Sequence, residues 1–304
     1  ISLFIMIVEV HSQVPESFVN GFTPPLKGKI YLSGNFAEPR GGHFHAGCDI
    51  KTGGVIGKSL HAVEKGYVAR VNISPWGYGK AIYIMHADSV MTVYGHIDHF
   101  APKLQKEIRK MQYEQQAFRL DSSLAAGIIP VEKDEVFAYS GNSGSSGGPH
   151  LHFEIRTQPG DSLYNPQDLL NVTDTRAPEF KSLVVFNLSE TPGNNAQRSV
   201  SKRLRYISGT DYQTGLISLP FDSLGIAVEV IDRMNYTHNR YGLEHIRLFV
   251  DDSLVYHSHI DHLSYNYQSE KEGLFDYYYE KKYRDHVQKC FREPGWDLPL
   301  IETN

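Results

Sequence analysis

The segment at residues 148–155 constrains the fold most, because it combines a strand-like pattern with two histidines at positions i and i+2. Side chains alternate between the two faces of a β-strand, so His150 and His152 share one face and the apolar residues between and after them share the other. Glu154 continues the histidine face. The pattern predicts a sheet with one face against a core and two imidazoles on the other, where they can share a metal ion or divide metal binding and proton transfer.

Length and composition place this strand in a two-domain protein. A chain of 304 residues with 40% hydrophobic and 21% charged residues is typical of two domains that each bury a core. The net charge of −5 argues against a nucleic-acid-binding protein, which needs a basic face. Proline and asparagine punctuate the chain near residues 165–178, so we expect one domain at 25–172 and a second at 178–304.

The pattern of the chain is mainly β. Short β-type runs separated by glycine and proline fill residues 25–100, and a helical pattern follows at 102–119, within an insert at 101–134. After residue 178, closely spaced strand patterns predict an immunoglobulin-like β-sandwich. A hairpin is expected where Asp251 and Asp252 separate two of these strands.

The first residues favour export. Residues 1–10 are an apolar run too short to span a bilayer, and residues 1–12 fit part of a signal peptide, so we expect a fragment whose first residues are missing; the last residues also end without a stop signal. The alternative is a first core strand. Cys48 and Cys290 are too few for a disulfide framework and are interpreted as small buried residues.

A second element upstream strengthens the prediction of a metal site. His45 and Asp49 are four residues apart, and Gly47 between them favours a turn into a strand. One imidazole from the 148–155 strand would complete a set of two nitrogens and one oxygen, which suits a catalytic zinc ion with an open fourth position. His96 ends another predicted strand, and His43 is the nearest competing ligand.

Three segments together resemble the lysostaphin-like, or LytM-type, zinc endopeptidases. They are residues 40–49 (Arg-Gly-Gly-His-Phe-His-Ala-Gly-Cys-Asp), 94–96 (Tyr-Gly-His) and 141–154, from Gly-Asn-Ser-Gly to Gly-Pro-His-Leu-His-Phe-Glu. The resemblance covers roughly residues 28–170 and implies an antiparallel β-sheet peptidase domain that holds one Zn²⁺. It implies that the zinc ligands are His45, Asp49 and His152, with His96 and His150 as the catalytic pair.

The resemblance also implies a substrate and a location. The expected activity is hydrolysis of peptide bonds in peptidoglycan stems or cross-bridges, by an enzyme in the bacterial periplasm or cell envelope. Zinc in such a site acidifies water and polarises the scissile carbonyl. The C-terminal domain is expected to dock on a cell-envelope protein or to inhibit the peptidase.

Further roles are assigned to individual side chains. Glu154 is a candidate partner of a zinc-binding histidine, and Tyr94 and Asn142 are candidate substrate contacts. The 101–134 insert is interpreted as a lid or as a segment that alters substrate access. The glycine-rich loop at 141–149 lacks the Gly-Lys-Ser/Thr ending of a phosphate-binding loop, so we expect it to wrap the site.

One segment and the function of the whole chain leave alternatives open. The histidine-rich segment at 257–262 is interpreted as an exposed strand followed by a turn, since no partner motif accompanies it. The whole chain is alternatively a catalytically silent LytM-type regulator that recruits or activates another cell-wall hydrolase. A zinc amidase that cuts the sugar–peptide bond is a third reading.

Overall fold

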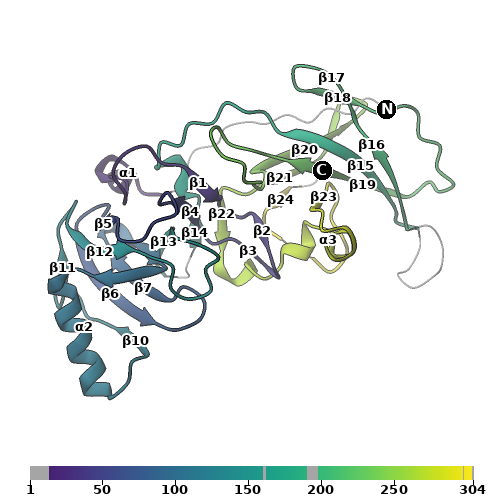
Figure 1. Ribbon diagram of the computed structural model, residues 1–304. Helices are drawn as coiled ribbons and strands as arrows, with labels where there is room; N and C mark the ends of the chain where they lie inside the picture. The colour runs from purple at the N-terminus through teal and green to yellow at the C-terminus, as the bar shows by residue number, and fades with distance from the viewer. Residues whose placement is uncertain (1–13, 160–161, 190–197, 297, 303–304) are drawn as a thin grey trace.

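The computed structural model describes residues 14–159, 162–189, 198–296 and 298–302, which form two lobes (Figure 1). The N-terminal lobe comprises residues 14–170 and the C-terminal lobe residues 179–302. The expected signal peptide at 1–12 lies outside the described residues and stays a prediction. Within the described ranges, no helix is long and apolar enough to cross a membrane.

The N-terminal lobe contains an antiparallel sheet whose central strands carry the expected site. Seven strands follow one another in the order β1, β4, β13, β8, β7, β6 and β10. Their bounds in this order are Leu32–Gly34, Cys48–Lys51, His150–Thr157, Val90–Gly95, Lys80–Met85, Gly66–Ile73 and Leu120–Ser123. β11 (Pro130–Val131) pairs with β6, and β14 (Ser162–Tyr164) pairs with β13.

Smaller elements complete this lobe. A second sheet has the order β5, β12, β9, and β2 pairs with β3 beside the site. The strands are β5 (Ser59–His61), β12 (Val136–Ser140), β9 (Ile97–Phe100), β2 (Pro39–Arg40) and β3 (His43–Phe44), and the helical elements are α1 (Glu16–Gly21), α2 (Pro102–Gln115), η1 (Ala87–Ser89) and η2 (Pro166–Asp168). The predicted alternation along β13 is present: Leu151 and Phe153 are fully buried in the core on one face, with the histidines on the other.

The insert at 101–134 packs against the sheets of the N-terminal lobe. Its helix α2 begins at Pro102, which is favoured at a first helical position, and buries Leu104 and Ile108 one turn apart. α2 contacts β9 and β12, while β10 and β11 extend the sheet beside β6. Three strands, β6, β7 and β8, therefore separate β10 from β13, and the role of the insert in substrate access stays a prediction.

The C-terminal lobe is also antiparallel, which confirms the mainly β prediction. One sheet has the order β16, β15, β19, β23, and a second has the order β20, β21, β24. The strands are β15 (Glu179–Asn187), β16 (Ser199–Arg203), β17 (Arg205–Ser208), β18 (Asp211–Gln213), β19 (Leu224–Ile231), β20 (His245–Val250), β21 (Ser253–His259), β23 (Val287–Lys289) and β24 (Ile301–Glu302), and the helical elements are η3 (Tyr265–Tyr267), η4 (Lys271–Gly273) and α3 (Tyr277–Tyr283).

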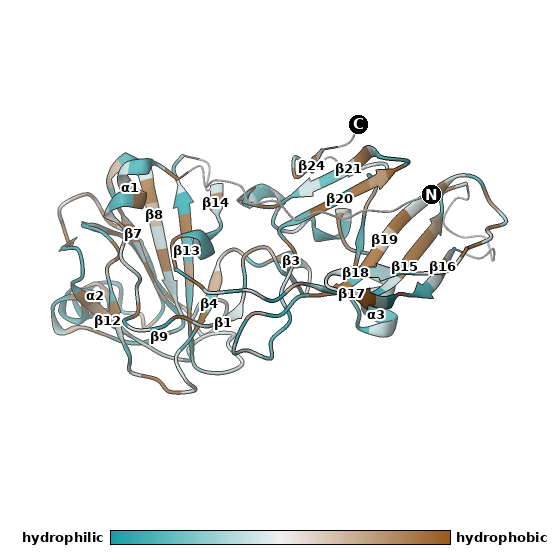
Figure 2. Cartoon of the chain, turned by 90° about the horizontal axis from the view of Figure 1, so that it is seen from above, coloured by the Kyte–Doolittle hydropathy of each residue, from teal (hydrophilic) through white to brown (hydrophobic). Residues whose placement is uncertain are grey.

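Apolar side chains of both sheets belong to one hydrophobic cluster. Val185 and Val228 of the first sheet and Ile246 and Tyr256 of the second are buried members of it. Figure 2 shows hydrophobic stretches along β15, β19 and β20. The same cluster includes core residues of the N-terminal lobe, so the immunoglobulin-like sandwich stays a prediction.

The two lobes share a sheet, which the sequence did not predict. β22 (His262–Ser264), from the C-terminal half of the chain, pairs with β14 and so extends the N-terminal sheet. Next to the site, the backbone N–H of Phe44 donates to the carbonyl oxygen of Gln268 over 2.7 Å. Cys48 and Cys290 are both free and buried, as expected.

Candidate metal centre

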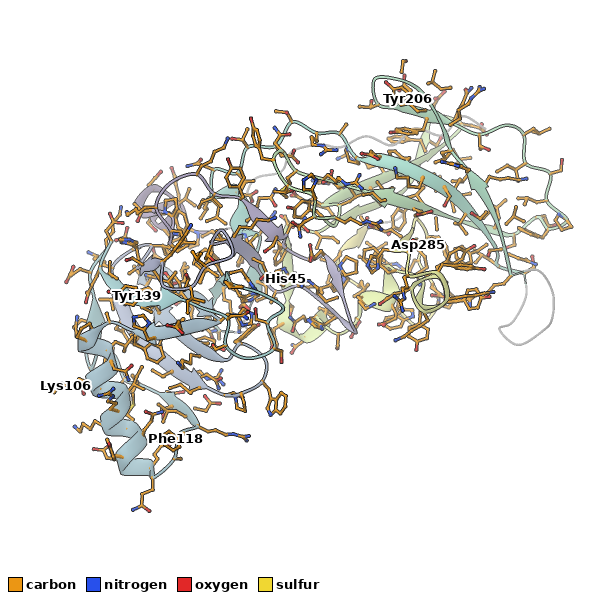
Figure 3. The ribbon with its side chains drawn as sticks, in the orientation of Figure 1. His45, Lys106, Phe118, Tyr139, Tyr206 and Asp285 are labelled. Atoms are coloured by element: carbon orange, nitrogen blue, oxygen red, sulfur yellow. The ribbon has the colours of Figure 1, made fainter. Side chains whose placement is uncertain are left out.

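Strand register brings the predicted ligands together. β13 lies between β4 and β8, and His152 is paired directly with Asp49 on β4 and with Gly95 on β8. His45 lies just before β4. Between His45 and β4, Gly47 passes so close to the Phe153 carbonyl that a Cβ would not fit. Figure 3 shows His45 between the part of the N-terminal lobe that carries Lys106 and the C-terminal lobe that carries Asp285.

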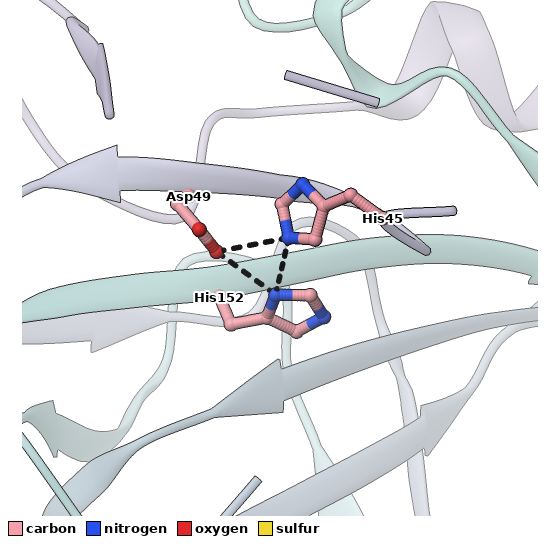
Figure 4. Close-up of side chains that lie close together, drawn as sticks. All are labelled: His45, Asp49 and His152. Carbon is pink, nitrogen blue, oxygen red and sulfur yellow. Dashed lines mark hydrogen bonds and ion pairs between the residues drawn. The ribbon is translucent and has the colours of Figure 1, made fainter. Parts of the chain in front are cut away.

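Three donor atoms form a nearly equilateral triangle (Figure 4). His45 Nε2 lies 3.1 Å from His152 Nδ1 and 3.1 Å from Asp49 Oδ1, and His152 Nδ1 lies 2.9 Å from Asp49 Oδ1. All three side chains are buried. Ligand atoms of a tetrahedral zinc ion lie about 3.3 Å apart, given zinc–nitrogen and zinc–oxygen bonds of about 2.0–2.1 Å. The triangle therefore fits the size of a zinc site.

The tautomers of both imidazoles favour a cation at the centre. His45 Nδ1 donates to the Asn35 carbonyl oxygen over 2.7 Å, so Nε2 of the neutral ring carries a lone pair. His152 Nε2 is 2.8 Å from the Glu154 carboxylate, so its Nδ1 carries a lone pair as well. Two lone pairs and a carboxylate oxygen repel one another at 3 Å unless a proton or metal ion lies between them. Two nitrogens and one oxygen are a donor set that zinc accepts.

Electrostatics at the centre favour positive charge. Burial opposes ionisation of Asp49, but the charge of His45 and hydrogen bonds from the neighbouring imidazoles outweigh it and hold the pKa of Asp49 well below its ordinary value. Burial also opposes protonation of His152, yet hydrogen bonds to Asp49 and Glu154 raise its pKa to about 9. Arg40 Nη2 donates to Asp49 Oδ2 over 2.7 Å, which leaves Oδ1 facing the histidines.

The Glu154 carboxylate lies where the sequence suggested, in contact with His152. It is fully buried, and Arg156 donates to its other oxygen over 2.6 Å. Burial disfavours the charged form, but the positive charge of Arg156 and hydrogen bonds lower the pKa of Glu154 to about 2. The Tyr78 hydroxyl also donates to Glu154, and the Tyr78 ring stacks on His152 at 4.9 Å. Hydrogen-bonded carboxylates of this kind orient metal-binding histidines.

His96 and His150 flank the triangle. Their ring centroids are 4.7 Å apart, and His150 Nε2 lies 3.4 Å from Asp49 Oδ1. The glycine-rich loop fixes both tautomers: His96 Nδ1 donates to the Ser143 carbonyl and His150 Nδ1 to the Gly148 carbonyl, each over 2.8 Å. Both Nε2 atoms are then free of hydrogen in the neutral rings and can accept a proton. Burial, with the charges of the two neighbouring histidines, lowers the pKa of His96 to about 4.

Some predicted roles do not fit. Tyr94 is fully buried on the core face, and its ring packs edge-on against Phe137 at 4.7 Å. The substrate-contact role of Tyr94 is therefore wrong. Asn142 is exposed in the loop, where its side-chain oxygen accepts a hydrogen bond from Ser146 over 2.6 Å. Among the described residues, His43 is exposed on β3 and is not a member of the ligand group.

Other residues of the centre carried little sequence signal. Arg40 stands in the quoted 40–49 segment, but nothing in the pattern shows that its guanidinium reaches Asp49. Arg156 continues the alternation of His150, His152 and Glu154, so the strand pattern alone places it on the site face. Tyr78 comes from the loop before β7, and the sequence offers no signal for it.

Comparisons with solved structures give distant likenesses. A mutant of the catalytic domain of the prophage-encoded M23 protein EnpA from Enterococcus faecalis is 23% identical, over 45% of this chain and 88% of that one, with a TM-score of 0.33. The catalytic domain of the antimicrobial peptidase lysostaphin from Staphylococcus simulans is 19% identical, over 51% and 97%, with a TM-score of 0.33. A complex of SpoIIIAH and SpoIIQ gives 18% identity, over 48% and 98%, with a TM-score of 0.35.

The family comparison is more specific. No curated protein matches the chain. Residues 43–116 match the model of peptidase family M23, a range that includes His45, Asp49 and His96. Residues 43–116 are therefore similar to peptidase family M23, and the predicted resemblance to the LytM-type peptidases is confirmed.

Proposed function

We propose that this protein is a zinc metalloendopeptidase that hydrolyses peptide bonds in peptidoglycan. The observation that carries the proposal is the convergence of His45 Nε2, Asp49 Oδ1 and His152 Nδ1 within 3.1 Å of one another, beside two further histidines. A structural zinc site is normally closed by four protein ligands, whereas three protein ligands with neighbouring proton acceptors are typical of catalytic sites.

The chain's own groups have distinct tasks in this proposal. Zinc held by His45, Asp49 and His152 supplies Lewis acidity, which polarises a carbonyl and acidifies water. His150 Nε2 and His96 Nε2 are the available proton acceptors, and their Nδ1 hydrogens are fixed by loop carbonyls. One of them takes a proton from the attacking water and passes one to the leaving amine, while the other can donate a hydrogen bond from Nε2 to the developing oxyanion only as an imidazolium, because its neutral ring carries the hydrogen on Nδ1.

The substrate and the location rest on sequence. The three segments at 40–49, 94–96 and 141–154 resemble those of peptidoglycan endopeptidases, and the 43–116 match supports a peptidase. The apolar run at residues 1–10 supports export to the periplasm or cell envelope. A reporter enzyme that is active only after secretion, fused behind residues 1–25, tests export, and a reporter that stays inactive contradicts it.

Zinc content and turnover test the activity together. Purified protein should hold zinc and release soluble fragments from isolated cell-wall sacculi. His150→Ala should lower the rate by about 10²–10⁴-fold, the range for loss of a positioned acid–base group, and should keep its zinc. The control is His238→Ala, because His238 is exposed and outside the centre. Wild-type protein that holds zinc but releases nothing from sacculi or from defined peptidoglycan peptides contradicts the proposal.

The products separate the remaining alternatives. Mass spectrometry of the released fragments should show cleaved peptide bonds with the sugar–peptide bond intact. Cleavage of the sugar–peptide bond identifies an amidase instead. Zinc-free protein that only stimulates an added amidase identifies a regulator. The presence of all five site residues argues against that alternative.

A further inference from the structure

A second group of histidines and carboxylates lies in the C-terminal lobe, on the β20–β21 hairpin. The strand register places His245 directly opposite His259, and Arg247 opposite His257. The rings of His245 and His259 are stacked, with centroids 3.9 Å apart and planes 11° apart. Glu244 immediately precedes β20. Cross-strand neighbours on one face of a sheet are close enough to bind the same ion.

The ligand atoms of this group converge. Glu244 Oε1 lies 3.6 Å from His259 Nε2 and 3.9 Å from His245 Nε2, and the three atoms all lie within 4.8 Å of one another. His245 is only 3% exposed, and its Nε2 has no hydrogen-bond partner among the residues that the structure describes. A buried polar nitrogen without a partner costs free energy, so this atom needs a ligand.

The charge of the group also favours a cation. Asp261 Oδ1 lies 3.9 Å from His259 Nε2, which adds a second carboxylate. Within the described residues, the ion-pair partners of Glu244 and Asp261 are histidines, while the charge of Arg247 opposes a cation at His245, whose pKa is lowered by burial and also by that charge. The sequence interpretation of 257–262 as an exposed strand and turn is corrected here, because His259 and Asp261 are largely buried and His259 on β21 faces His245 on β20.

We propose that Glu244, His245 and His259 form a second metal site, which binds a divalent transition ion of the zinc type. Two imidazole nitrogens and one carboxylate oxygen are donors for zinc, cobalt and nickel. The separations of 3.6 and 3.9 Å from Glu244 Oε1 exceed the spacing of about 3.3 Å around tetrahedral zinc, and one of the two stacked rings has to turn so that both in-plane lone pairs point at one ion. Asp261, whose Oδ1 lies 3.9 Å from His259 Nε2, is a candidate for the fourth position that a structural site requires.

The position of the group suggests a structural role. The backbone carbonyl of Asp261 accepts a hydrogen bond from the N–H of Asn165 in the N-terminal lobe, over 3.0 Å. β22 begins at the next residue and pairs with β14. An ion bound by Glu244 and the two histidines therefore ties the β20–β21 hairpin at the junction of the lobes, and binding to the folded state alone stabilises the protein.

Metal analysis of the whole chain tests this site separately from the peptidase centre. Wild-type protein dialysed against micromolar free zinc should hold two equivalents, and Asp49→Ala should still hold one. Adding His245→Ala to Asp49→Ala should remove the second equivalent and the rise in melting temperature that zinc causes. Cobalt in Asp49→Ala should give the visible absorption bands of a four-coordinate ion, and these bands should vanish in the double variant.

Two controls keep the test decisive. Because His245 is buried and its replacement can disturb folding, Glu244→Gln offers a variant of almost the same shape that lowers affinity without removing bulk. His238→Ala in the Asp49→Ala background keeps its equivalent, since His238 is exposed outside the group. Asp49→Ala protein that is folded but binds neither zinc nor cobalt overturns the proposal, whatever the wild-type activity on sacculi.

Discussion

The two histidine–carboxylate groups of this protein have the same kinds of donor atom and differ in how those atoms are held. At the peptidase centre, every ligand also makes a hydrogen bond through an atom that does not face the metal position, here called its second contact. His45 contacts the Asn35 carbonyl, His152 contacts Glu154, and Asp49 contacts Arg40. In the β20–β21 group, the second contact of His245 is a 3.3 Å approach to His257.

This difference shows in the spacing of the ligand atoms. Those of the peptidase centre are 2.9–3.1 Å apart, whereas Glu244 Oε1 lies 3.6 and 3.9 Å from the two histidine nitrogens of the β20–β21 group. Ligands that are held in place by second contacts lose less freedom when they bind an ion. Residue type therefore defines which metal a group can bind, while the surrounding hydrogen bonds define how tightly it binds.

The largest expected effect separates the two groups by activity. Asp49→Ala should lower peptidase activity at least about a thousandfold, because metal-ion stabilisation of the transition state is worth several kcal/mol. His259→Ala should keep activity within about threefold, because distant sites act independently. Rates of sacculus solubilisation measure both. Equal losses of activity in the two variants would contradict this prediction and show that the β20–β21 group belongs to the catalytic machinery.

A smaller effect is expected when the second contact of His152 is weakened. Glu154→Gln should reduce zinc affinity at the peptidase centre by about 10–100-fold, the range for loss of a carboxylate that orients a metal-binding histidine. Competition with a fluorescent chelator measures the affinity, and circular dichroism checks the fold. The matched control is Glu179→Gln, which changes a carboxylate paired with Lys181 in the other lobe. Unchanged zinc affinity in Glu154→Gln would show that the carboxylate does not support the ligand.

The order in which the two groups lose zinc tests whether second contacts control zinc affinity. In a chelator titration of wild-type protein, the β20–β21 group should release its ion first, with an affinity at least about tenfold lower than that of the peptidase centre. Activity should therefore survive removal of the first equivalent. Loss of activity with the first equivalent would reverse the order and show that second contacts do not control affinity here.

Much of the peptidase centre could be predicted from sequence, because alternation along a strand is a local property. The histidine face of β13 and its apolar face follow from the order of residues alone. The pairing of His152 with Asp49 depends on register, and from the sequence the two residues are brought to one zinc ion only by the resemblance to known peptidases. Tyr94 was misplaced for the same reason. It pairs with Phe153 and shares the core face, while its neighbour Gly95 pairs with His152 on the site face.

The β20–β21 group shows why register limits such predictions. The hairpin turn at Asp251 and Asp252 was predicted, and both residues adopt the positive φ that a tight turn requires. Counting back from this turn pairs His245 with Ser258. A β-bulge between Leu248 and Phe249 shifts the register by one residue, so that His245 faces His259 instead. Sequence reasoning missed the second group because the bulge is not visible in the residue pattern.

The smallest expected effect concerns the second contact within the β20–β21 group. His257 Nε2 lies 3.3 Å from His245 Nδ1, at the long end of hydrogen-bond distances, so it orients His245 weakly. His257→Ala should therefore lower zinc affinity by about threefold, which corresponds to the weak end of hydrogen-bond contributions. Cobalt titration in the Asp49→Ala background measures it, with His238→Ala as the control. A loss as large as that expected for Glu154→Gln would mean that the two groups are held equally well, because the weaker contact would then orient its ligand as strongly as a buried carboxylate does.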